Sequence, residues 1–521
     1  MSTPALFVLC TLVVLIAVLM KDRMRPGMVL LTGAVVFLCA GILTPREMLE
    51  GFSNKGMITV ALLYLVSEGV RQSGILEQLF RRLLPSAGTG IRSIQMRLLP
   101  TVAFVSAFLN NTPVVVIFAP MIKRWAEVVK LPATKFLIPL SYATILGGVC
   151  TLIGTSTNLV VDGMVIDAGF PGFTMFELGK VGIFIAIVGL LYLILFSKYL
   201  LPESRTNADE FLFDTTSGSG RYKYVEVVLS ARFPAIGRKV GDFDFQKKYG
   251  ASVMELRRGG EVFLMKDMRK LRYHEGDTLV LMADEDFRQN WGDSSFFLMV
   301  TSNETAATEP RISRVKRWMA LFLLVVMIAG ATLGELPAIR DAVPGVRMDM
   351  FFFAAVVTII MAWLNIFPAR KYTKYISWDI LITIASAFAI SKAMMNSGMA
   401  DAIAQFVIGL TDSFGPYFLL VVIFIITDLF TELMTNNAAA ALAFPISLSL
   451  AQHLGVSPMP FFVTICMAAS ASFSTPIGYQ TNLIVQSVGG YRFGDFVRVG
   501  LPLNIISLVL SVTLIPLIWP F

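Results

Sequence analysis

Two short clusters of amide and hydroxyl side chains interrupt long apolar segments of this sequence. The first cluster is Asn110-Asn111-Thr112, which is followed by Pro113, and the second is Thr435-Asn436-Asn437. Amide, hydroxyl and freed backbone oxygens are suitable ligands for a small hard cation. Helices that begin in these clusters would direct their N–H groups and the positive ends of their dipoles at an anion. These residues therefore predict a site that binds a cation and an anion together.

A second pair of polar segments follows the two clusters at matching distances. Residues 154–158 read Gly-Thr-Ser-Thr-Asn, and residues 478–482 read Gly-Tyr-Gln-Thr-Asn. The central Asn of each cluster precedes the last Asn of the next segment by 47 residues in the first half and by 46 in the second. The glycine of a Ser-Gly pair precedes the same central Asn by 37 residues (at 73–74) and by 38 (at 397–398). This order and spacing predict two copies of one fold.

The segments that must position these residues are strongly apolar. Of the 521 residues, 55% are hydrophobic and 15% are charged, and the mean hydropathy is +0.71. A soluble chain would be expected to have about a quarter of its residues charged. The uncharged runs are long enough to cross the ~30 Å hydrocarbon core of a bilayer, which predicts a multi-pass protein of the plasma (inner) membrane. The predicted spans lie at 5–20, 27–43, 57–74, 97–122, 136–165, 180–201, 318–336, 350–367, 377–395, 417–450, 460–488 and 499–519.

The composition also excludes several classes of function. The two histidines, His274 and His453, are far apart, and the chain has neither an H-E-x-x-H nor a G-x-x-x-x-G-K-[ST] motif. These observations argue against an enzyme and against a nucleotide-hydrolysing pump. A net charge of +7 would suggest nucleic acid as the partner of a soluble protein. In a membrane protein, the excess of basic residues in cytoplasmic loops accounts for this charge, so no nucleic acid partner is expected.

The positions of Lys and Arg predict the orientation of the spans. Residues 98–122 have basic residues at both flanks, which predicts a re-entrant hairpin from the cytoplasmic side, with one kinked span as the alternative. Residues 417–450 have no basic flank and are too long for one crossing, which predicts a hairpin from the outside. Each half then has five crossings and one hairpin. Because five is an odd number, the second half is inverted, which is the usual architecture of secondary transporters.

The predicted fold class is an all-α polytopic membrane protein of two inverted repeats, with a small α+β cytoplasmic insert. We assign residues 1–202 to the first membrane repeat and residues 314–521 to the second. Residues 203–313 are rich in charge and contain no span, so they are predicted to lie in the cytoplasm. This insert is expected to have a linker at 203–220 and a folded core at about 222–288.

These features resemble the divalent anion/sodium symporter family, which comprises sodium-coupled dicarboxylate, citrate and sulfate carriers. That family has a Ser-Asn-Thr signature at each hairpin tip and a Gly-Ser/Thr-Pro-Pro-Asn-type break in a later helix of each repeat. The corresponding tips here are residues 110–112 and 435–437, and the corresponding breaks are residues 154–158 and 478–482. The resemblance covers both membrane halves.

The resemblance implies which residues bind the ions. One sodium would be surrounded by Ser106, Asn110, Asn111 and Gly154. The other sodium would be surrounded by Thr431, Thr435, Asn436 and Gly478. The anion would lie between Asn111, Thr112, Thr155, Asn436, Asn437 and Tyr479. Sodium is then the coupling ion, and no other cofactor is expected.

The resemblance also implies a homodimer in which each hairpin-bearing unit moves as an elevator against a scaffold. This sequence departs from the family pattern in two ways. The Pro-Pro pair is absent from both breaks, and Tyr479 is bulky where the family has a small hydroxyl residue. These departures leave the anion open between a C4-dicarboxylate or citrate-like substrate and a smaller anion such as sulfate.

The insert resembles the C-terminal regulatory domain of potassium-conductance regulators, often called TrkA-C. β-type patterns begin near Val225, Ser252 and Thr278, and Phe243–Gly250 is typical of a short helix with a glycine stop. The resemblance implies pairing between copies and a small effector, with a purely structural dimerisation module as the alternative. It depends on Gly237, Tyr249-Gly250, Arg257-Arg258-Gly259 and Glu275-Gly276-Asp277-Thr278-Leu279.

Two pairs of charged residues within predicted membrane segments suggest specific roles. Glu68 and Lys392 have equivalent repeat positions and opposite signs, which favours a structural ion pair between the halves over a role in coupling. Asp428 and Glu432 are four residues apart and therefore share one face of a helix. They are expected either to bind a proton or cation or to line a wet entrance on the outer side.

The sequence thus predicts a secondary active transporter that couples sodium to the symport of a small divalent anion. The partners expected from this reading are the anion, sodium ions, the lipid bilayer, a second copy of the chain and an effector of the insert. A proton-coupled anion carrier is the nearer alternative. A ligand-gated ion channel controlled by the insert is the more distant one, because the chain has no T-V-G-Y-G filter.

Overall fold

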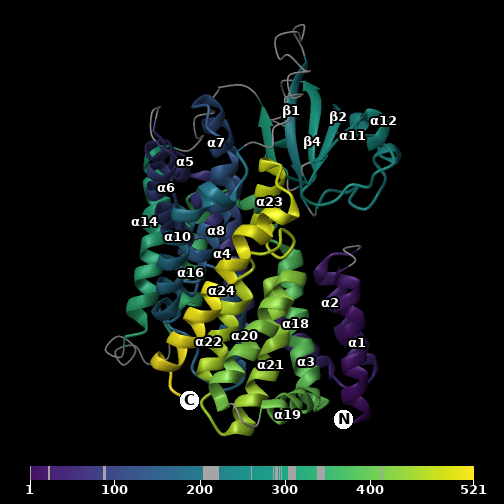
Figure 1. Ribbon diagram of the computed structural model, residues 1–521, viewed down its shortest axis with the longest axis vertical. Helices are drawn as coiled ribbons and strands as arrows, with labels where there is room; N and C mark the ends of the chain where they lie inside the picture. Colours follow the sequence, from purple (N-terminus) through teal and green to yellow (C-terminus); the bar gives the residue numbers. More distant parts are fainter. Residues whose placement is uncertain are drawn as a thin grey trace.

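The computed structural model shows a helical bundle with a small β-sheet domain at one end (Figure 1). We call the end of the bundle that carries this domain the insert side. The predicted linker at 203–220 falls outside the described residues, apart from Glu203. The structure describes residues 2–20, 24–85, 90–203, 222–230, 232–259, 261–284, 287, 291–292, 294, 296–302, 313–336, 347–411 and 415–521.

The first half of the bundle contains the elements expected from the apolar runs. Its helices are α1 (Thr3–Met20), α2 (Pro26–Cys39), α3 (Pro45–Glu50), η1 (Gly51–Ser53), α4 (Lys55–Gln72), α5 (Ile75–Leu83), α6 (Ile91–Ser106), α7 (Asn111–Val128), α8 (Thr134–Gly148), α9 (Ser156–Asp167) and α10 (Gly179–Leu200).

The second half repeats this order. Its helices are α14 (Arg314–Gly334), α16 (Met350–Trp363), η4 (Ala369–Lys371), α17 (Tyr372–Tyr375), α18 (Trp378–Asn396), α19 (Met399–Thr411), α20 (Gly415–Leu433), α21 (Asn436–Leu454), α22 (Met459–Ser470), α23 (Gln480–Gly489) and α24 (Phe493–Ile518).

Each half contains one helical hairpin and one broken helix, as predicted. The long apolar runs divide at the polar clusters into α6 and α7 and into α20 and α21, and the later runs divide into α8 and α9 and into α22 and α23. The pairing of elements is also reciprocal, because α2 packs on α18 while α16 packs on α4. Helices α10, α14, α18, α20 and α24 are long and apolar enough to cross a membrane. The protein is therefore a polytopic membrane protein with a small α+β insert.

The ends of α4 and α18 show the repeat in backbone detail. Each helix is followed by a C-cap serine and then by a left-handed glycine, with Gly74 at φ 70° and Gly398 at φ 72°. Glycine adopts this conformation without the steric penalty that a Cβ atom would cause. The chain then turns into α5 in the first half and into α19 in the second. The Ser-Gly spacing in the sequence is therefore the spacing of two equivalent turns.

The predicted pair between Glu68 and Lys392 is wrong. Glu68 instead accepts hydrogen bonds from Arg71 (2.7 Å and 2.8 Å) and from Gln72 (2.5 Å). Helices α4 and α18 run in opposite directions, so equivalent positions near their C-terminal ends lie at opposite sides of the bundle. Lys392 lies near the carboxylates of Glu47 and Asp167. An inverted repeat separates equivalent charges instead of pairing them.

The insert forms a five-stranded antiparallel sheet in the order β3-β2-β4-β1-β5. A short helix, α11 (Phe245–Tyr249), ends at Gly250 with φ 70°, as the sequence predicted. Strand β5 pairs with β1 although it follows the predicted core of the insert at 222–288. The strands are β1 (Tyr222–Leu229), β2 (Ala251–Arg258), β3 (Glu261–Leu264), β4 (Thr278–Asp284) and β5 (Phe297–Ser302).

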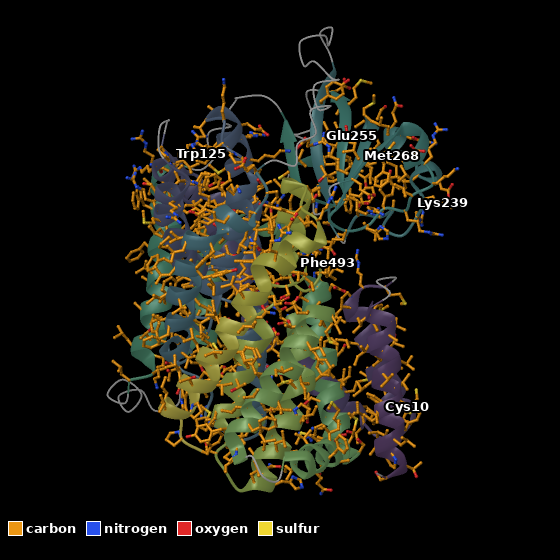
Figure 2. All side chains as sticks on the ribbon, viewed as in Figure 1. Cys10, Trp125, Lys239, Glu255, Met268 and Phe493 are labelled. Carbon is orange, nitrogen blue, oxygen red and sulfur yellow. The ribbon has the colours of Figure 1, made fainter. Side chains whose placement is uncertain are left out.

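Figure 2 shows the described side chains along the length of the molecule. Lys239, Glu255 and Met268 belong to the insert, whereas Cys10 lies on α1 at the edge of the bundle. Trp125 lies toward the insert side, where its indole N–H donates to the carbonyl of Pro85 (3.0 Å). An indole with one apolar face and one polar partner is typical of a membrane boundary.

Candidate functional site

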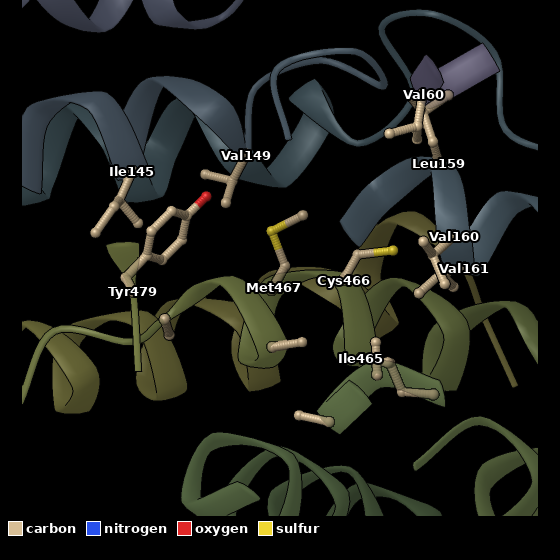
Figure 3. Close-up of a cluster of buried hydrophobic side chains, with 14 of the residues drawn as sticks. Val60, Ile145, Val149, Leu159, Val160, Val161, Ile465, Cys466, Met467 and Tyr479 are labelled. Carbon is tan, nitrogen blue, oxygen red and sulfur yellow. The ribbon is translucent and has the colours of Figure 1, made fainter. Parts of the chain in front are cut away.

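Four interruptions in the helices meet inside the bundle. They are the two hairpin tips, at residues 107–110 and 434–435, and the two breaks, at residues 149–155 and 471–479. Tyr479 comes from the second break, and its hydroxyl is the centre of the meeting point. Figure 3 shows this hydroxyl directed toward the helices of the first half, beside Ile145 and Val149.

The Tyr479 hydroxyl joins the two halves directly. It accepts a hydrogen bond from Asn111 Nδ2 at the first tip (2.5 Å) and lies 3.3 Å from Thr155 Oγ1 in the first break. All three side chains are buried, with 9%, 1% and 2% of their surface exposed for Tyr479, Asn111 and Thr155. The tyrosine therefore occupies part of the volume in which the sequence predicts the anion.

The second tip makes the reciprocal contact with the first break. Ser156 and Thr157 donate their hydroxyls to Asn437 Oδ1, at 3.3 Å and 3.2 Å. On the other side, Thr112 Oγ1 donates to Gln480 Oε1 at 3.4 Å. Five of the six predicted anion residues thus lie in contacts between the tips and the breaks, whereas the sixth, Asn436, is bonded to Thr431 of its own hairpin. None of the six is basic.

The two predicted sodium sites have the same construction. In the first, Ser106 Oγ donates to Asn111 Oδ1 (2.7 Å). In the second, Thr431 Oγ1 donates to Asn436 Oδ1 (2.8 Å). In each half the hydroxyl comes from the last turns of the first hairpin helix and the amide from the first residue of the second helix. These oxygen pairs are of the ligand type that a hard cation requires.

Both predicted sodium sites also depend on a glycine. A Cβ atom on Gly154 would lie 2.5 Å from the carbonyl oxygen of Gly148. A Cβ atom on Gly478 would lie 2.6 Å from the carbonyl oxygen of Thr431. Neither distance is compatible with an ordinary contact, so only glycine fits at these positions. The close approach brings backbone carbonyl groups to the edge of each site.

Two asparagines hold the breaks in shape. Asn158 Nδ2 donates to the carbonyl of Thr151 (2.9 Å), and Asn482 Nδ2 donates to the carbonyl of Thr475 (3.1 Å). The hydroxyls of Thr151 and Thr475 in turn accept from the N–H groups of the two site glycines, at 3.1 Å and 3.2 Å. Sequence reasoning assigned no role to these threonines. Their separation of 324 residues equals that of the two asparagines, so the repeat spacing would have identified them.

The insert reaches this site from its own side of the bundle. Glu275 Oε1 accepts a hydrogen bond from Gln480 Nε2 (3.2 Å), and Thr278 is hydrogen-bonded to Ser487. Gly276 between them faces Leu483. The turn before β4 therefore lies along α23, the helix that begins directly after Tyr479. The sequence contained no signal for this contact, because it joins segments about 200 residues apart.

The two remaining predicted sodium ligands, Asn110 and Thr435, lie at the starts of the tip helices. Asn110 is the residue before α7, and Thr435 is the residue before α21, so each tip helix begins with the central Asn of its cluster. The hydroxyl of Thr435 is buried and has no hydrogen-bond partner among the described residues. This hydroxyl can therefore form a further hydrogen bond or bind an ion.

The fold and the site define a class. Two oppositely directed repeats, each with a re-entrant hairpin and a broken helix, form a multi-pass membrane transporter whose polar interruptions meet inside the bundle. The profile of the citrate transporter family, CitMHS, matches residues 13–455 and 347–520. The chain belongs to this family, and it is a transporter and not an enzyme.

Relatives that match nearly the whole chain are also named as transporters. An uncharacterised transporter of Synechocystis sp. is 29% identical, over 93% of this chain and 92% of its own. A probable sodium/sulfate cotransporter of Chlamydomonas reinhardtii is 23% identical, over 90% of this chain and 83% of its own. A sodium-dependent dicarboxylate transporter of Staphylococcus saprophyticus is 20% identical, over 92% of this chain and 79% of its own.

Proposed function

We propose that the protein is a secondary active transporter that couples sodium to the symport of a small divalent anion. The observation that carries this proposal is the pair of equivalent hydroxyl–amide contacts, Ser106–Asn111 and Thr431–Asn436, one in each repeat. Tyr479 of the second repeat is hydrogen-bonded to Asn111 of the first. The relatives named for sodium/sulfate and sodium-dependent dicarboxylate transport support the same substrate class.

The residue types favour a cation as co-substrate. A divalent anion loses much hydration when it enters the bundle, and the cost is large unless opposite charge accompanies it. The site has amides, hydroxyls and helix N-termini but no Lys or Arg among its predicted ligands. Two sodium ions, one at each tip, would supply the missing positive charge. Sodium would then be required both for binding and for transport.

The size of the site favours a compact anion. Tyr479 fills the space between Asn111 and Thr155, so little room remains for a carbon chain between two carboxylates. A tetrahedral oxyanion such as sulfate can accept hydrogen bonds from several directions within a small volume. We therefore place sulfate ahead of C4-dicarboxylates and citrate-like anions as the substrate.

The reciprocal packing suggests how the site changes sides. The two hairpins and the broken helices would form the moving unit, and α2, α4, α16 and α18 would form the scaffold. This arrangement would operate as an elevator within a homodimer of the plasma membrane, with the insert in the cytoplasm. An effector of the insert would act on this movement.

Uptake into proteoliposomes tests the proposal. Purified protein is reconstituted and loaded with sodium-free buffer, and the uptake of radiolabelled sulfate and succinate is measured with inward sodium, potassium or proton gradients. We expect sulfate uptake that requires the sodium gradient and that is lost in Asn436→Ala. Tyr192→Phe, on the outer helix α10, serves as the control. Uptake driven by the proton gradient alone would establish the proton-coupled alternative and refute sodium coupling.

A further inference from the structure

A polar cluster inside the second repeat is not used by the predicted sites. Asp428 and Glu432 lie one turn apart on α20, and Asn504 faces them from α24. Asn504 Nδ2 is 3.2 Å and 3.3 Å from the two carboxylate oxygens of Asp428 and 3.0 Å from Glu432 Oε1. One amide nitrogen thus lies among three carboxylate oxygens. Glu432 and Asn504 are only 9% and 6% exposed.

Several oxygens of this cluster lack a partner. Glu432 Oε2, Asn504 Oδ1 and the hydroxyl of Ser474 are buried and form no hydrogen bond with any described residue. Ser474 belongs to the same cluster, because its N–H donates to Glu432 Oε1 (2.7 Å). Buried polar atoms in proteins are nearly always paired, and three unpaired oxygens on mutually bonded residues indicate an absent ligand.

The charge of the cluster points to the kind of ligand. Within the described parts of the chain, neither Asp428 nor Glu432 forms an ion pair with a lysine or arginine. Carboxylates inside a membrane are costly unless positive charge accompanies them, and they usually mark functional sites. Carboxylate, amide and hydroxyl oxygens together form a ligand set for a hard cation and not for a soft one.

The cluster has no counterpart in the first repeat. Asn111 and Asn436 are 325 residues apart, and the same interval places Ala103 and Ala107 opposite Asp428 and Glu432. Gly147 packs so closely on Ala103 that even a Cβ atom on the glycine would overlap the alanine backbone. The cluster is therefore separate from the two tip sites, which occur in both repeats.

We propose that Asp428, Glu432, Ser474 and Asn504 form a third sodium site, next to the tip of the second hairpin. The amide of Asn504 turns its oxygen toward the ion when the site is filled, since amide orientation adapts to its hydrogen-bond partners. This proposal extends the proposed sodium coupling, because a third sodium raises the number of positive charges that move with each anion. Its position beside Thr431 links its occupancy to that of the second tip site.

A binding measurement separates this site from the tip sites. The full-length protein is purified in lipid nanodiscs, and its melting temperature is followed as sodium chloride replaces choline chloride at constant ionic strength. The background variant Asn111→Ala/Asn436→Ala removes the central ligand of each tip. We expect sodium to raise the melting temperature of this background variant, and we expect the rise to disappear when Asp428→Asn and Glu432→Gln are added.

Two results would overturn the third site. One is a background variant that no longer responds to sodium, and the other is a sodium response that survives Asp428→Asn/Glu432→Gln. If the carboxylate variants have no melting transition in choline, Ser474→Ala replaces them and should raise the half-saturating sodium concentration several-fold. An unchanged half-saturating concentration in that variant would also count against the site.

Transport stoichiometry then shows whether the third ion is coupled. Reversal potentials of sulfate uptake should give one sodium fewer per anion in Glu432→Gln than in the wild type. Glu68→Gln, a similarly buried carboxylate that pairs with Arg71, should leave the ratio unchanged. Sodium-independent uptake by the wild type would refute the proposed function, whereas an unchanged ratio in Glu432→Gln would refute only the coupling of this ion.

Discussion

The side chain of Tyr479, from the second repeat, contacts both the tip and the break of the first repeat. Its neighbours, Asn111 and Thr155, are residues that the resemblance assigns to the anion. Under the proposed function, the hydroxyl would have the position of one oxygen of a bound oxyanion. It would then limit the size of the substrate and keep the side chains of Asn111 and Thr155 oriented when no anion is bound.

Shortening this side chain should change the substrate preference. In Tyr479→Ser the site gains the volume of the ring, so succinate uptake should rise relative to sulfate uptake by about tenfold, as pocket changes worth 1–3 kcal/mol allow. The ratio of the two initial rates in proteoliposomes measures this effect. Tyr192→Phe, which alters a tyrosine outside the site, is the control. A ratio equal to that of the wild type would show that Tyr479 does not limit substrate size.

Gly478 should tolerate no side chain. Because a Cβ atom there would lie 2.6 Å from the carbonyl of Thr431, Gly478→Ala should lower stability by about 1–3 kcal/mol, the usual cost of overpacking, and should abolish sodium-dependent uptake. Thermal unfolding and uptake are measured on the same preparation. Gly409→Ala on α19, where a Cβ atom would meet open space, is the matched control. Equal behaviour of the two variants would contradict the close approach.

The sequence predicted the polar clusters and breaks because each residue type recurs at the same interval in both halves. The partner predicted for Glu68 was wrong, because inversion places equivalent positions of the two repeats on opposite sides of the bundle. The sequence also contained no indication of the contact between Glu275 and Gln480, which joins two separately folded regions. Residue identity and spacing thus identified the candidate ligands, but the contacts between elements needed the three-dimensional structure.

At the level of the elements, two different sequence patterns predicted the hairpins and the sheet. The hairpins follow from the length of apolar runs and their charged flanks, and the sheet follows from alternating residues. Strand β5 was missed because the predicted core ended before it. The docking of the sheet was not predicted. One of its contacts comes from β1, where Glu226 forms an ion pair with Lys123 in the last turns of α7 (3.0 Å).

This docking contact should weaken at low pH. Burial would raise the pKa of Glu226, but Lys123 and Arg257 outweigh burial and hold the pKa below its ordinary value of 4.5. A lowered pKa stabilises the docked state above 4.5, and this stabilisation is lost as the pH falls from 4.5 through the lower folded value. Hydrogen exchange at β1 and at the end of α7 should therefore accelerate in that range.

The matched variant removes the lysine that pairs with Glu226, instead of neutralising the glutamate by protonation. Lys123→Gln should show the faster exchange already at neutral pH and should have little further pH response at this contact. Lys239→Gln, on the exposed surface of the insert, should behave as the wild type. Exchange that is slow in Lys123→Gln at every pH would contradict a role of the ion pair in docking.

In the whole molecule, the insert touches two groups of helices that the elevator proposal would separate. It contacts α7 and α23 through Glu226 and Glu275. It also contacts α17 and the residue after it, just before α18, where the guanidinium of Arg232 donates to the carbonyls of Lys374 (2.9 Å) and Ile376 (2.6 Å). The insert thus bridges the proposed moving unit and the proposed scaffold, and this bridge would restrain movement between them.

Releasing one end of the bridge should increase the rate of transport. Arg232→Ala should raise the maximal rate of sulfate uptake about twofold or more, because each lost hydrogen bond contributes ~0.5–1.5 kcal/mol. Arg238→Ala, an exposed arginine of the same domain, should leave the rate unchanged. The comparison is made in proteoliposomes at saturating sodium. A lower rate in Arg232→Ala would show that the bridge supports transport instead of restraining it.

The central claim is that two inverted repeats bring their polar tips together to bind one anion with sodium. Its most direct test is a cryo-electron microscopy map of the full-length protein in nanodiscs with sodium and sulfate, compared with one in choline and gluconate. We predict density for a compact anion beside Asn111, Thr155, Asn437 and Tyr479 in the sodium sulfate map alone. Tips that lie apart, or an anion bound only outside this junction, would contradict the claim.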